Sequence, residues 1–495
     1  MNRGKSLGIV AICVAALFSF LVMFLSFYPG FFSPDLYNQL AQATGKIPFN
    51  DWHPPLMALI WKLGIAVTGK TSSLFVLEIS IFILGLLLIS LSGSVTGRFN
   101  LFWSLVFVLL PLYAPILIQT GRQWKDQLLT FLLVVAVAML WIAGKKRRHL
   151  GLIVVFIFLA SAAMLLRANG VFAVIFLLPL AAWRVRQALF EAANSSGRMQ
   201  GISVKKQKLL AIGCVIVSLL LVTGGGLKAV VEETARPTPT HQLDQLLLDD
   251  IANTASVEDI DALDVSAEFK KYLKTTITKC GHCHPRQNLI WFQCADATVM
   301  DNPLKDKCGY TSKVQLENGT RVFPAIAYFH DEFMTAWIHT VPKHLPTYVG
   351  YRFKMFAYFI FAARNPRLKG ISDDFNPTFP GFYQVTGAYV NTLTKPLGRF
   401  LFCPVFYLLI SIVTLVIARR NRDWLPKEHF LFSFWLSFAS VFWLLSQIPI
   451  VPFPDYRYAY FSVVFTMLGL VFLMSGLRQG RLIDSEKLAN GERHE

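Results

Sequence analysis

The 495-residue sequence lacks several features that would assign it to a common soluble or exported class. Acidic residues are few, with 30 Asp and Glu against 47 Lys and Arg. Its apolar segments are continuous rather than alternating, which excludes a membrane β-barrel, and no repeat of about 20–50 residues occurs. The first apolar run, residues 7–27, is longer than the core of a signal peptide, and no small-residue cleavage site follows it. We therefore expect an uncleaved first helix.

Long apolar runs are what the sequence has in abundance. Hydrophobic residues make up 54% of the chain, and the mean hydropathy is +0.49. The runs have about 17–25 residues, the length that crosses a bilayer core of about 30 Å. We predict an all-α polytopic membrane protein with about ten transmembrane helices. The predicted spans are residues 7–27, 73–91, 101–118, 127–143, 150–166, 171–183, 209–227, 400–417, 430–445 and 461–477. The apolar stretch 54–67 is predicted to be re-entrant or interfacial.

The net charge of +17 follows from membrane topology. Basic loops at 144–149, 184–208 and 418–422 all fall on one side of the predicted bundle, as the positive-inside rule expects. The charge therefore predicts no nucleic-acid partner. It places both termini on the inner side of the membrane, and we expect a multi-pass protein whose long loop lies outside.

Three parts are predicted along the chain. Residues 1–227 form an N-terminal transmembrane module with its first outer loop at 28–72. Residues 228–398 form an α-rich extracytoplasmic domain, and residues 399–495 contain the last helices and a cytoplasmic tail. Four cysteines lie in the extracytoplasmic domain: Cys280, Cys283, Cys294 and Cys308. An oxidising exterior favours two disulfides over a zinc site, and the spacing leaves their pairing open.

Charged residues recur at the outer ends of the predicted helices. Asp35, Asp51 and His53 lie in the first outer loop, and the other outer loops carry Arg122, Lys125, Asp126, Arg167, Asp455 and Arg457. Charges near a bilayer are costly unless they are paired, hydrated or functional. We expect these groups to converge into a site for an anionic lipid.

One reaction type suits such a site. A sugar on a polyprenyl phosphate places its phosphate at headgroup level, where Arg and Lys hold it and stabilise the charge of its departure. Asp35 is predicted to be the general base for the acceptor hydroxyl, with Asp126 as the second choice or as a group that orients the acceptor. The predicted substrate-binding residues are Asp51, His53, Arg122, Lys125, Arg167, Arg457 and Tyr37. Trp124 is expected to belong to the interfacial aromatic belt.

Several short motifs carry a resemblance. Asp35 after the first helix, "HPPL" at 53–56 and "KDQLLTFLL" at 125–133 resemble the GT-C superfamily of membrane glycosyltransferases, which includes the protein O-mannosyltransferases and the lipid A aminoarabinose transferase. "PDYRYAY" at 454–460 matches more loosely. The resemblance implies a catalytic Asp35 and cations near the donor phosphate. Leu36 stands where many members carry a second acid, so no cofactor is expected, although a divalent metal stays open.

Within this superfamily the chain looks most like bacterial enzymes that modify O-antigen or lipopolysaccharide. The resemblance implies an inverting glycosyltransferase that moves a hexose from a polyprenyl-phosphate carrier to a surface glycan at the outer face. Its implied partners are the lipid-linked donor, the glycan acceptor and membrane lipid, and the sequence leaves open whether the chain acts alone or with a flippase and a carrier-loading glycosyltransferase. An O-antigen polymerase, a lipid-linked-sugar flippase or transporter, and an assembly protein stay open as alternatives.

Overall fold

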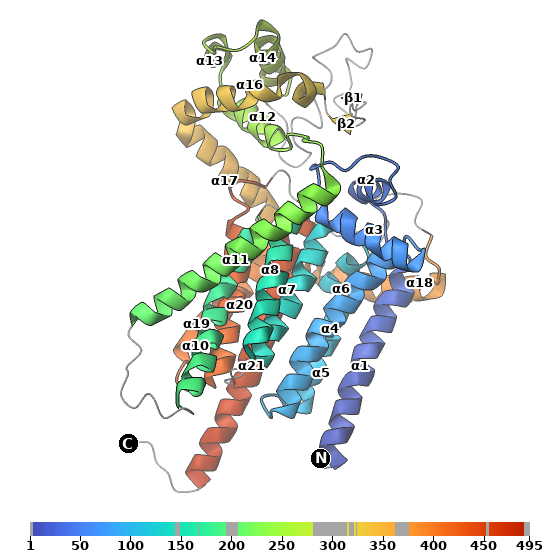
Figure 1. Cartoon of the computed structure of the whole chain (residues 1–495), viewed down its shortest axis with the longest axis vertical. Coiled ribbons are helices and arrows are strands. Elements are labelled where there is room, and N and C mark those ends of the chain that lie inside the picture. Colours follow the sequence, from blue (N-terminus) through green and yellow to red (C-terminus); the bar gives the residue numbers. More distant parts are fainter. Residues whose placement is uncertain are drawn as a thin grey trace.

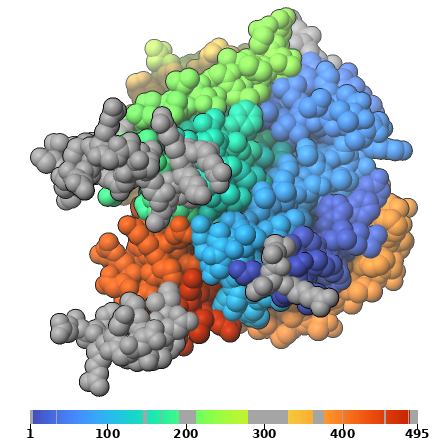
Figure 2. Space-filling view, turned by 60° about the horizontal axis from the view of Figure 1, so that its bottom comes forward, coloured from blue at the N-terminus to red at the C-terminus, as the bar shows by residue number. Residues whose placement is uncertain are grey.

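The structure is a computed structural model that describes residues 3–143, 149–167, 169–194, 206–280, 314–315, 321–322, 324–361, 376–451 and 455–489. Figure 1 shows a bundle of long helices with a smaller group of helices beyond one end and both chain termini at the other. We call these ends the domain end and the terminus end. Figure 2 looks toward the terminus end, where early (blue), middle (green) and late (orange to red) segments of the chain meet.

Each predicted span corresponds to one helix or to consecutive helices of the structure. The first half of the bundle contains α1 (Arg3–Phe27), α4 (Ser73–Val95), α5 (Leu101–Leu109), η1 (Leu110–Leu112), α6 (Ala114–Thr120), α7 (Lys125–Ile142), α8 (Leu150–Leu166), α9 (Gly170–Val174), η3 (Ile175–Leu177), α10 (Leu178–Asn194) and α11 (Lys206–Ala235). The second half contains α19 (Pro404–Arg420), α20 (Lys427–Leu445), η5 (Tyr456–Ala459) and α21 (Tyr460–Ala489). These helices confirm the predicted fold class.

Within the described residues, fewer helices reach membrane length than the ten spans that the sequence predicts. In the described part of the chain, seven helices are long and apolar enough to cross a membrane, or eight if the pair 101–112 and 114–120, bent by 49°, counts as one span. The helices α8 and α19 match predicted spans but have only 17 residues each. The count of about ten therefore stays a prediction.

Two short helices form the rim of the domain end. α2 (Pro34–Ala43) begins where the Ser33 hydroxyl accepts a hydrogen bond from Leu36 N at 3.3 Å, with proline at its first position, and both features favour a helix start. α3 (Leu56–Thr68) has 13 residues, which span about 20 Å. It is too short to cross a bilayer core, and it corresponds to the predicted re-entrant or interfacial stretch.

A helical cap lies beyond the domain end. It contains α12 (Leu243–Thr254), α13 (Val257–Asp261), α14 (Ala267–Cys280), α16 (Pro324–Thr340) and the antiparallel strands β1 (Val314–Gln315) and β2 (Arg321–Val322). Leu248, Ile251, Phe269, Leu273 and Phe333 are among the buried residues of its own core. The sequence predicted disulfides here. Cys283, Cys294 and Cys308 lie outside the described residues, as does the side chain of Cys280, so that prediction is untested.

The cap is joined to the bundle by η4 (Val341–His344) and α17 (Leu345–Phe361). Arg352 of α17 forms a buried ion pair with Asp250 of α12 and donates a hydrogen bond of 3.5 Å to the carbonyl of Val451, which lies between α20 and η5. The helix α18 (Pro380–Leu401), which precedes α19, packs against α1 and α6 at the domain end. Arg352 therefore connects the cap to the segment that follows α20.

The helix α7 is the centre of the bundle. All of its residues except Lys125, Met139 and Ile142 are buried, and it packs mainly between α4 and α8. Phe131 of α7 stacks on Phe82 of α4 with ring centroids 4.3 Å apart. Both ends of α7 are consequently enclosed by neighbouring helices, one at the domain end and the other at the terminus end.

The position of Arg184 differs from the predicted topology. The sequence placed the start of a basic loop at this residue, but it lies inside α10 and is fully buried. Its guanidinium contacts the Glu428 carboxylate at 2.8 Å and donates to the carbonyls of Leu140 and Trp141. These partners satisfy the charge, which is why the helix continues past the predicted loop boundary.

Candidate active site

Two loops pack together at the domain end and define the position of the site. Phe31 N donates to the carbonyl of Gly121 at 2.7 Å, and the Gln123 side-chain amide donates to the carbonyl of Pro29 at 3.0 Å. Gly30 has φ +104°, and a Cβ there would overlap the Gln123 side chain. The segment after α1 is thereby fixed against the segment before α7, which brings the starts of α2 and α7 together.

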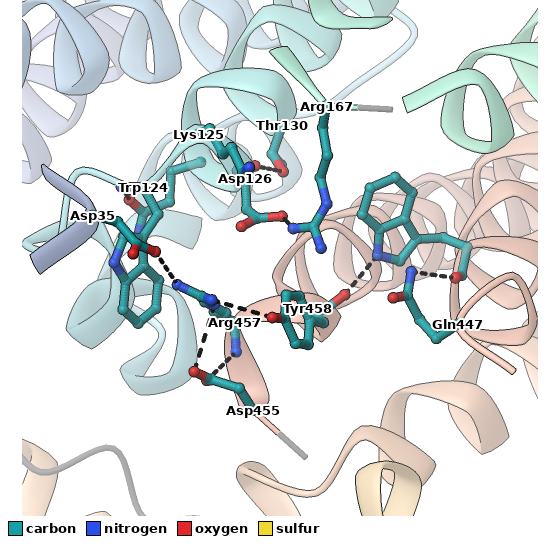
Figure 3. A network of polar contacts seen from close by, with 12 residues as sticks. Asp35, Trp124, Lys125, Asp126, Thr130, Arg167, Gln447, Asp455, Arg457 and Tyr458 are labelled. Atoms are coloured by element: carbon teal, nitrogen blue, oxygen red, sulfur yellow. Dashed lines mark hydrogen bonds and ion pairs between the residues drawn. The ribbon is translucent and has the colours of Figure 1, made fainter. Parts of the chain in front are cut away.

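Asp35 lies in the first turn of α2 and faces the cations of the cluster (Figure 3). Its Oδ2 is 2.9 Å from Arg457 Nη1, and its Oδ1 is 3.7 Å from His53 Nε2. Burial alone would raise the pKa of Asp35, but the charges of His53, Arg457 and Lys125 outweigh it and hold the pKa well below its ordinary value. The Asp35 side chain is 36% exposed. It is therefore an ionised carboxylate that a substrate can reach.

Arg457 is held by several groups at once. It follows Asp455, which caps η5 by accepting from Arg457 N at 3.0 Å and lies 3.5 Å from Arg457 Nε. Arg457 Nη2 donates to the Tyr458 hydroxyl at 3.1 Å. The guanidinium also lies 5.3 Å from the ring centroid of Trp124. Figure 3 shows it between Asp35 and Tyr458.

Trp124 is a buried residue that packs beside Arg122 and Arg457. Only 4% of it is exposed, its indole N–H donates to the Ser33 hydroxyl at 3.3 Å, and Arg122 lies 5.2 Å from its ring centroid. The expectation that Trp124 belongs to the interfacial aromatic belt is therefore wrong. A buried ring beside two guanidinium groups offers each a cation–π contact.

The start of α7 adds two further charged groups. Lys125 is its first residue, and Lys125 Nζ lies 3.3 Å from His53 Nδ1. Asp126 is the second residue and pairs with Arg167 at the end of α8. The first N–H groups of a helix carry partial positive charge and favour anions. Lys125 and Arg167 add to this positive potential.

The structure brings most of the predicted residues into one cluster. Its members are Asp35, His53, Arg122, Lys125, Asp126, Arg167, Asp455 and Arg457, which contact one another or share contacts with Trp124 or Tyr458. Four of these side chains, Arg122, Lys125, Arg167 and Arg457, are cations apart from histidine, and three, Asp35, Asp126 and Asp455, are carboxylates. The cluster thus carries an excess of positive charge suited to an anionic group.

Two predicted residues lie elsewhere. Asp51 accepts hydrogen bonds from Thr240 N and Thr240 Oγ1, each at 2.6 Å, and its own N–H donates to the carbonyl of Thr238 at 3.1 Å. It joins the first outer loop to the segment after α11, and it also lines a pocket of about 560 Å³. Tyr37 is 43% exposed on α2, where its ring stacks on Phe32 at 5.3 Å.

Sequence reasoning gave no role to Tyr458 and only a general one to Asp455. Both flank Arg457, and both contact its guanidinium. The signal was the segment "PDYRYAY" before the last helix, in which one carboxylate and three tyrosines surround a single arginine. Only the folded chain shows that this segment meets Asp35, which is 422 positions earlier in the sequence.

The carboxylates of the cluster are each engaged by an arginine. Arg457 contacts Asp35 and Asp455, and Arg167 contacts Asp126. Throughout the ranges that the structure describes, no three His, Cys, Asp or Glu side chains are grouped so that they could hold a metal ion. The donor set of the cluster fits an anion better than a cation.

No family model and no curated protein sequence matches the chain. The fold is similar to that of the S. cerevisiae protein O-mannosyltransferase Pmt1–Pmt2 complex bound to the sugar donor, with 12% identity and a TM-score of 0.37 over 54% of this chain. The chain spans 38% of the length of that protein.

It is also similar to ArnT from Cupriavidus metallidurans bound to undecaprenyl phosphate, with 13% identity and a TM-score of 0.31 over 97% of this chain and 79% of ArnT. ArnT in the apo state matches with 12% identity and a TM-score of 0.32, over 95% of this chain and 77% of ArnT. These matches are a likeness of fold alone, and the superfamily that the motifs indicated stays a resemblance. At these TM-scores the matches carry no argument about individual residues or substrates.

Proposed function

We propose that this protein is an inverting glycosyltransferase of the bacterial inner membrane. It transfers a sugar from a polyprenyl-phosphate carrier to a surface glycan, O-antigen or a related lipopolysaccharide, at the domain end, which faces the periplasm. One observation carries the proposal. At the ends of membrane-length helices, an ionised and reachable carboxylate, Asp35, lies among four basic side chains that exceed the carboxylates around them.

The basic side chains would bind the donor phosphate. Arg457, Lys125 and Arg167 converge on the start of α7, where the helix N–H groups add partial positive charge. Hydrogen bonds between such cations and a phosphate are short and strong. The same groups stabilise the negative charge that grows on the phosphate as the sugar leaves. A polyprenyl chain would extend from this position into the bilayer beside the helices.

Asp35 is the better candidate for the general base. Its side chain is 36% exposed, whereas that of Asp126 is 4% exposed and paired with Arg167. An acceptor hydroxyl must come within hydrogen-bond distance of the base, and of these two carboxylates Asp35 offers that access. The role that we assign to Asp126 is to hold Arg167 in place.

The transfer step balances with these groups alone. The acceptor oxygen attacks the anomeric carbon, and its proton passes to an Asp35 oxygen. The bond between the anomeric carbon and the phosphate oxygen breaks, and its electron pair leaves with the polyprenyl phosphate. Attack from the face opposite the phosphate inverts the configuration at the anomeric carbon.

The resting ion pair between Asp35 and Arg457 bears on the order of binding. While Arg457 contacts Asp35 at 2.9 Å, the carboxylate is a weak base because its pKa lies well below the ordinary value. A bound donor phosphate would attract Arg457 and weaken its hold on the carboxylate, which raises the basicity of Asp35. The donor should therefore bind before the acceptor.

The decisive experiment is sugar transfer in a membrane preparation. Radiolabelled polyprenyl-phosphate sugars are offered with surface glycan as acceptor, and wild type is compared with Asp35→Asn at matched expression. Loss of a general base slows transfer by about 10²–10⁴-fold. We expect a loss of at least about a hundredfold in the variant, with polyprenyl-phosphate binding retained.

Asp264→Asn is the matched control, because Asp264 is an exposed carboxylate of the cap outside the cluster. It should transfer sugar at the wild-type rate. Unchanged transfer by Asp35→Asn would remove Asp35 from the mechanism and leave Asp126 to be tested in the same way. Absence of transfer by the wild type with every donor would contradict the proposed reaction and favour a polymerase or a transporter.

A further inference from the structure

Tyr458 contacts two arginines of the cluster. Its hydroxyl accepts from Arg457 Nη2 at 3.1 Å, and its ring centroid lies 5.0 Å from the Arg457 guanidinium carbon. The same ring lies 4.7 Å from the guanidinium carbon of Arg167, which comes from the end of α8. Two cations from opposite parts of the sequence therefore meet at one tyrosine.

Tyr458 is buried, its backbone is held by hydrogen bonds, and its ring packs near a ring of α17. Only 5% of the residue is exposed. Its carbonyl accepts from the Trp443 indole N–H at 2.7 Å, and its N–H donates to the carbonyl of Asp455 at 3.2 Å. Phe359 of α17 packs within 6.5 Å of its ring. A side chain held by α17, α20 and η5 is a rigid support for the groups that lie on it.

Two guanidinium groups repel each other, so their common position needs compensation. Asp126 supplies it for Arg167, and Asp35 and Asp455 supply it for Arg457. Tyr458 adds an electron-rich ring face to both and a hydroxyl oxygen to one, and each attracts a cation. It does so without adding a negative charge, which would compete with a phosphate for the same arginines.

We propose that Tyr458 is a positioning residue that holds Arg167 and Arg457 pointed at one phosphate group of the donor. It acts through the arginines and does not itself touch the reacting atoms. This inference rests on the proposed function, because it names the residue that aligns the donor-binding cations of that site.

The test separates the hydroxyl from the ring. Tyr458→Phe removes the hydroxyl that accepts from Arg457 and keeps the ring, and Tyr458→Leu also removes the ring from both arginines. Tyr456→Phe is the matched control, because Tyr456 is equally buried on η5 but its hydroxyl donates to the carbonyl of Leu401 at 3.2 Å. The purified full-length protein is titrated with a polyprenyl phosphate that carries no sugar, and KM values are measured for donor and acceptor.

A hydrogen bond to a charged group is worth about tenfold or more in an equilibrium constant. We expect Tyr458→Phe to weaken polyprenyl-phosphate binding and raise the donor KM by about tenfold, with the acceptor KM unchanged. Tyr458→Leu should weaken binding by about a hundredfold. Tyr456→Phe should leave both constants at the wild-type value.

The outcomes distinguish this inference from the proposed function. If the wild type transfers sugar and Tyr458→Phe binds the carrier as Tyr456→Phe does, Tyr458 does not position the arginines and the inference fails alone. A rise in the acceptor KM in place of the donor KM also overturns it. A wild type that neither binds the polyprenyl phosphate nor transfers sugar overturns both proposals. Because Tyr458→Phe keeps the ring, it tests the inference even if Tyr458→Leu does not fold.

Discussion

The two ends of α7 carry the same kinds of side chain, arginine and carboxylate, in opposite electrostatic settings. At the terminus end, the Glu428 carboxylate lies 2.8 Å from both Arg98 Nε and Arg184 Nη1. Arg184 also donates to the carbonyl of Leu140 at 2.7 Å, and Arg98 donates to that of Trp141 at 2.9 Å. The last carbonyls of a helix carry partial negative charge, so these two arginines meet negative groups from the end of α7 and from Glu428.

At the domain end, the cations meet the positive end of the same helix. Lys125 is the first residue of α7, and Arg167 and Arg457 approach from other helices. Three carboxylates do not offset four basic side chains and the helix dipole together. Arginine and carboxylate at the negative end of α7 therefore form a structural clamp whose charges are satisfied, whereas the same groups at its positive end retain an excess of positive charge that an anion would neutralise.

The largest expected effect is at the terminus end. Glu428→Gln removes the carboxylate shared by two arginines, one of which is fully buried. Removing one partner of a buried ion pair costs about 3–5 kcal/mol, so we expect a loss of this size in the free energy of unfolding. Denaturant unfolding in detergent measures it. If the clamp is only structural, the folded fraction of the variant should keep the wild-type donor KM.

A large effect on activity is expected at the domain end. Arg167→Gln removes a cation that would hold the donor phosphate and should lower kcat/KM for the donor by about a hundredfold, because a charge-assisted hydrogen bond is lost in the transition state. Steady-state transfer assays with varied donor measure this.

Arg184→Gln is the corresponding change at the other end of α7 and serves as its control. It should lower the free energy of unfolding without changing the donor KM. If Arg167→Gln and Arg184→Gln lost donor affinity equally, the view that only the domain end of α7 binds the donor would be wrong.

The third prediction concerns pH. The pKa of Asp35 is held below its ordinary value by His53, Arg457 and Lys125. Asp35 therefore stays ionised as the pH falls, and transfer should decline only in acid well below neutrality. Arg457→Gln removes one of these charges and raises the pKa, so the acidic limb of kcat/KM should move to higher pH by about one unit. A pH profile of kcat/KM on the residual activity, extended into acid below the ordinary pKa of an aspartate (about 3.9), would show the shift. If the acidic limb does not move in Arg457→Gln, it does not report the ionisation of Asp35.

The contribution of Asp35 to the free energy of unfolding should fall with pH in the same direction as the activity. A carboxyl group with a lowered pKa in the folded state contributes stability above its unfolded pKa, and this contribution is lost as the pH falls through the folded value. The Asp35 ion pairs should therefore stabilise the protein fully at neutral pH and not in strong acid.

The smallest effect is expected from Asp51, the second acid of the first outer loop. Asp51→Asn keeps a side-chain oxygen that can accept from Thr240, so the free energy of unfolding should fall by less than about 1 kcal/mol. The donor KM should not change, because Asp51 lies outside the cluster. A thermal unfolding curve and a donor titration test both points, and a raised donor KM would return Asp51 to the substrate-binding residues that the sequence predicted.

Much of the fold could be predicted because membrane helices are specified locally. α8 begins and ends at the predicted residues, since a run of 17 residues without a charge has no other stable form in a bilayer. Predictions were weaker where charged residues continue a helix. α11 extends to Ala235, beyond the predicted end at 227, and Lys228 and Glu232 form an ion pair of 3.5 Å one turn apart within that extension.

The site could be predicted only as a set of candidates. The sequence places Asp35, Asp51 and His53 in one outer loop, and nothing in their order distinguishes the acid that faces the cations from the acid that accepts from Thr240. Similarly, a tryptophan near a helix start resembles a member of the aromatic belt. Trp124 is instead enclosed, because the loops after α1 and before α7 close over it.

Short segments of the sequence are enough to specify a bundle of membrane helices with ionisable residues at the helix ends, because apolar length and charge position are local properties. Which of these charges meet depends on how the helices pack. Arg457 reaches Asp35 across 422 positions, and Tyr458 joins it to Arg167. These contacts depend on how helices from distant parts of the chain pack around α7, and that packing is a sum of many side-chain contacts that no single segment specifies.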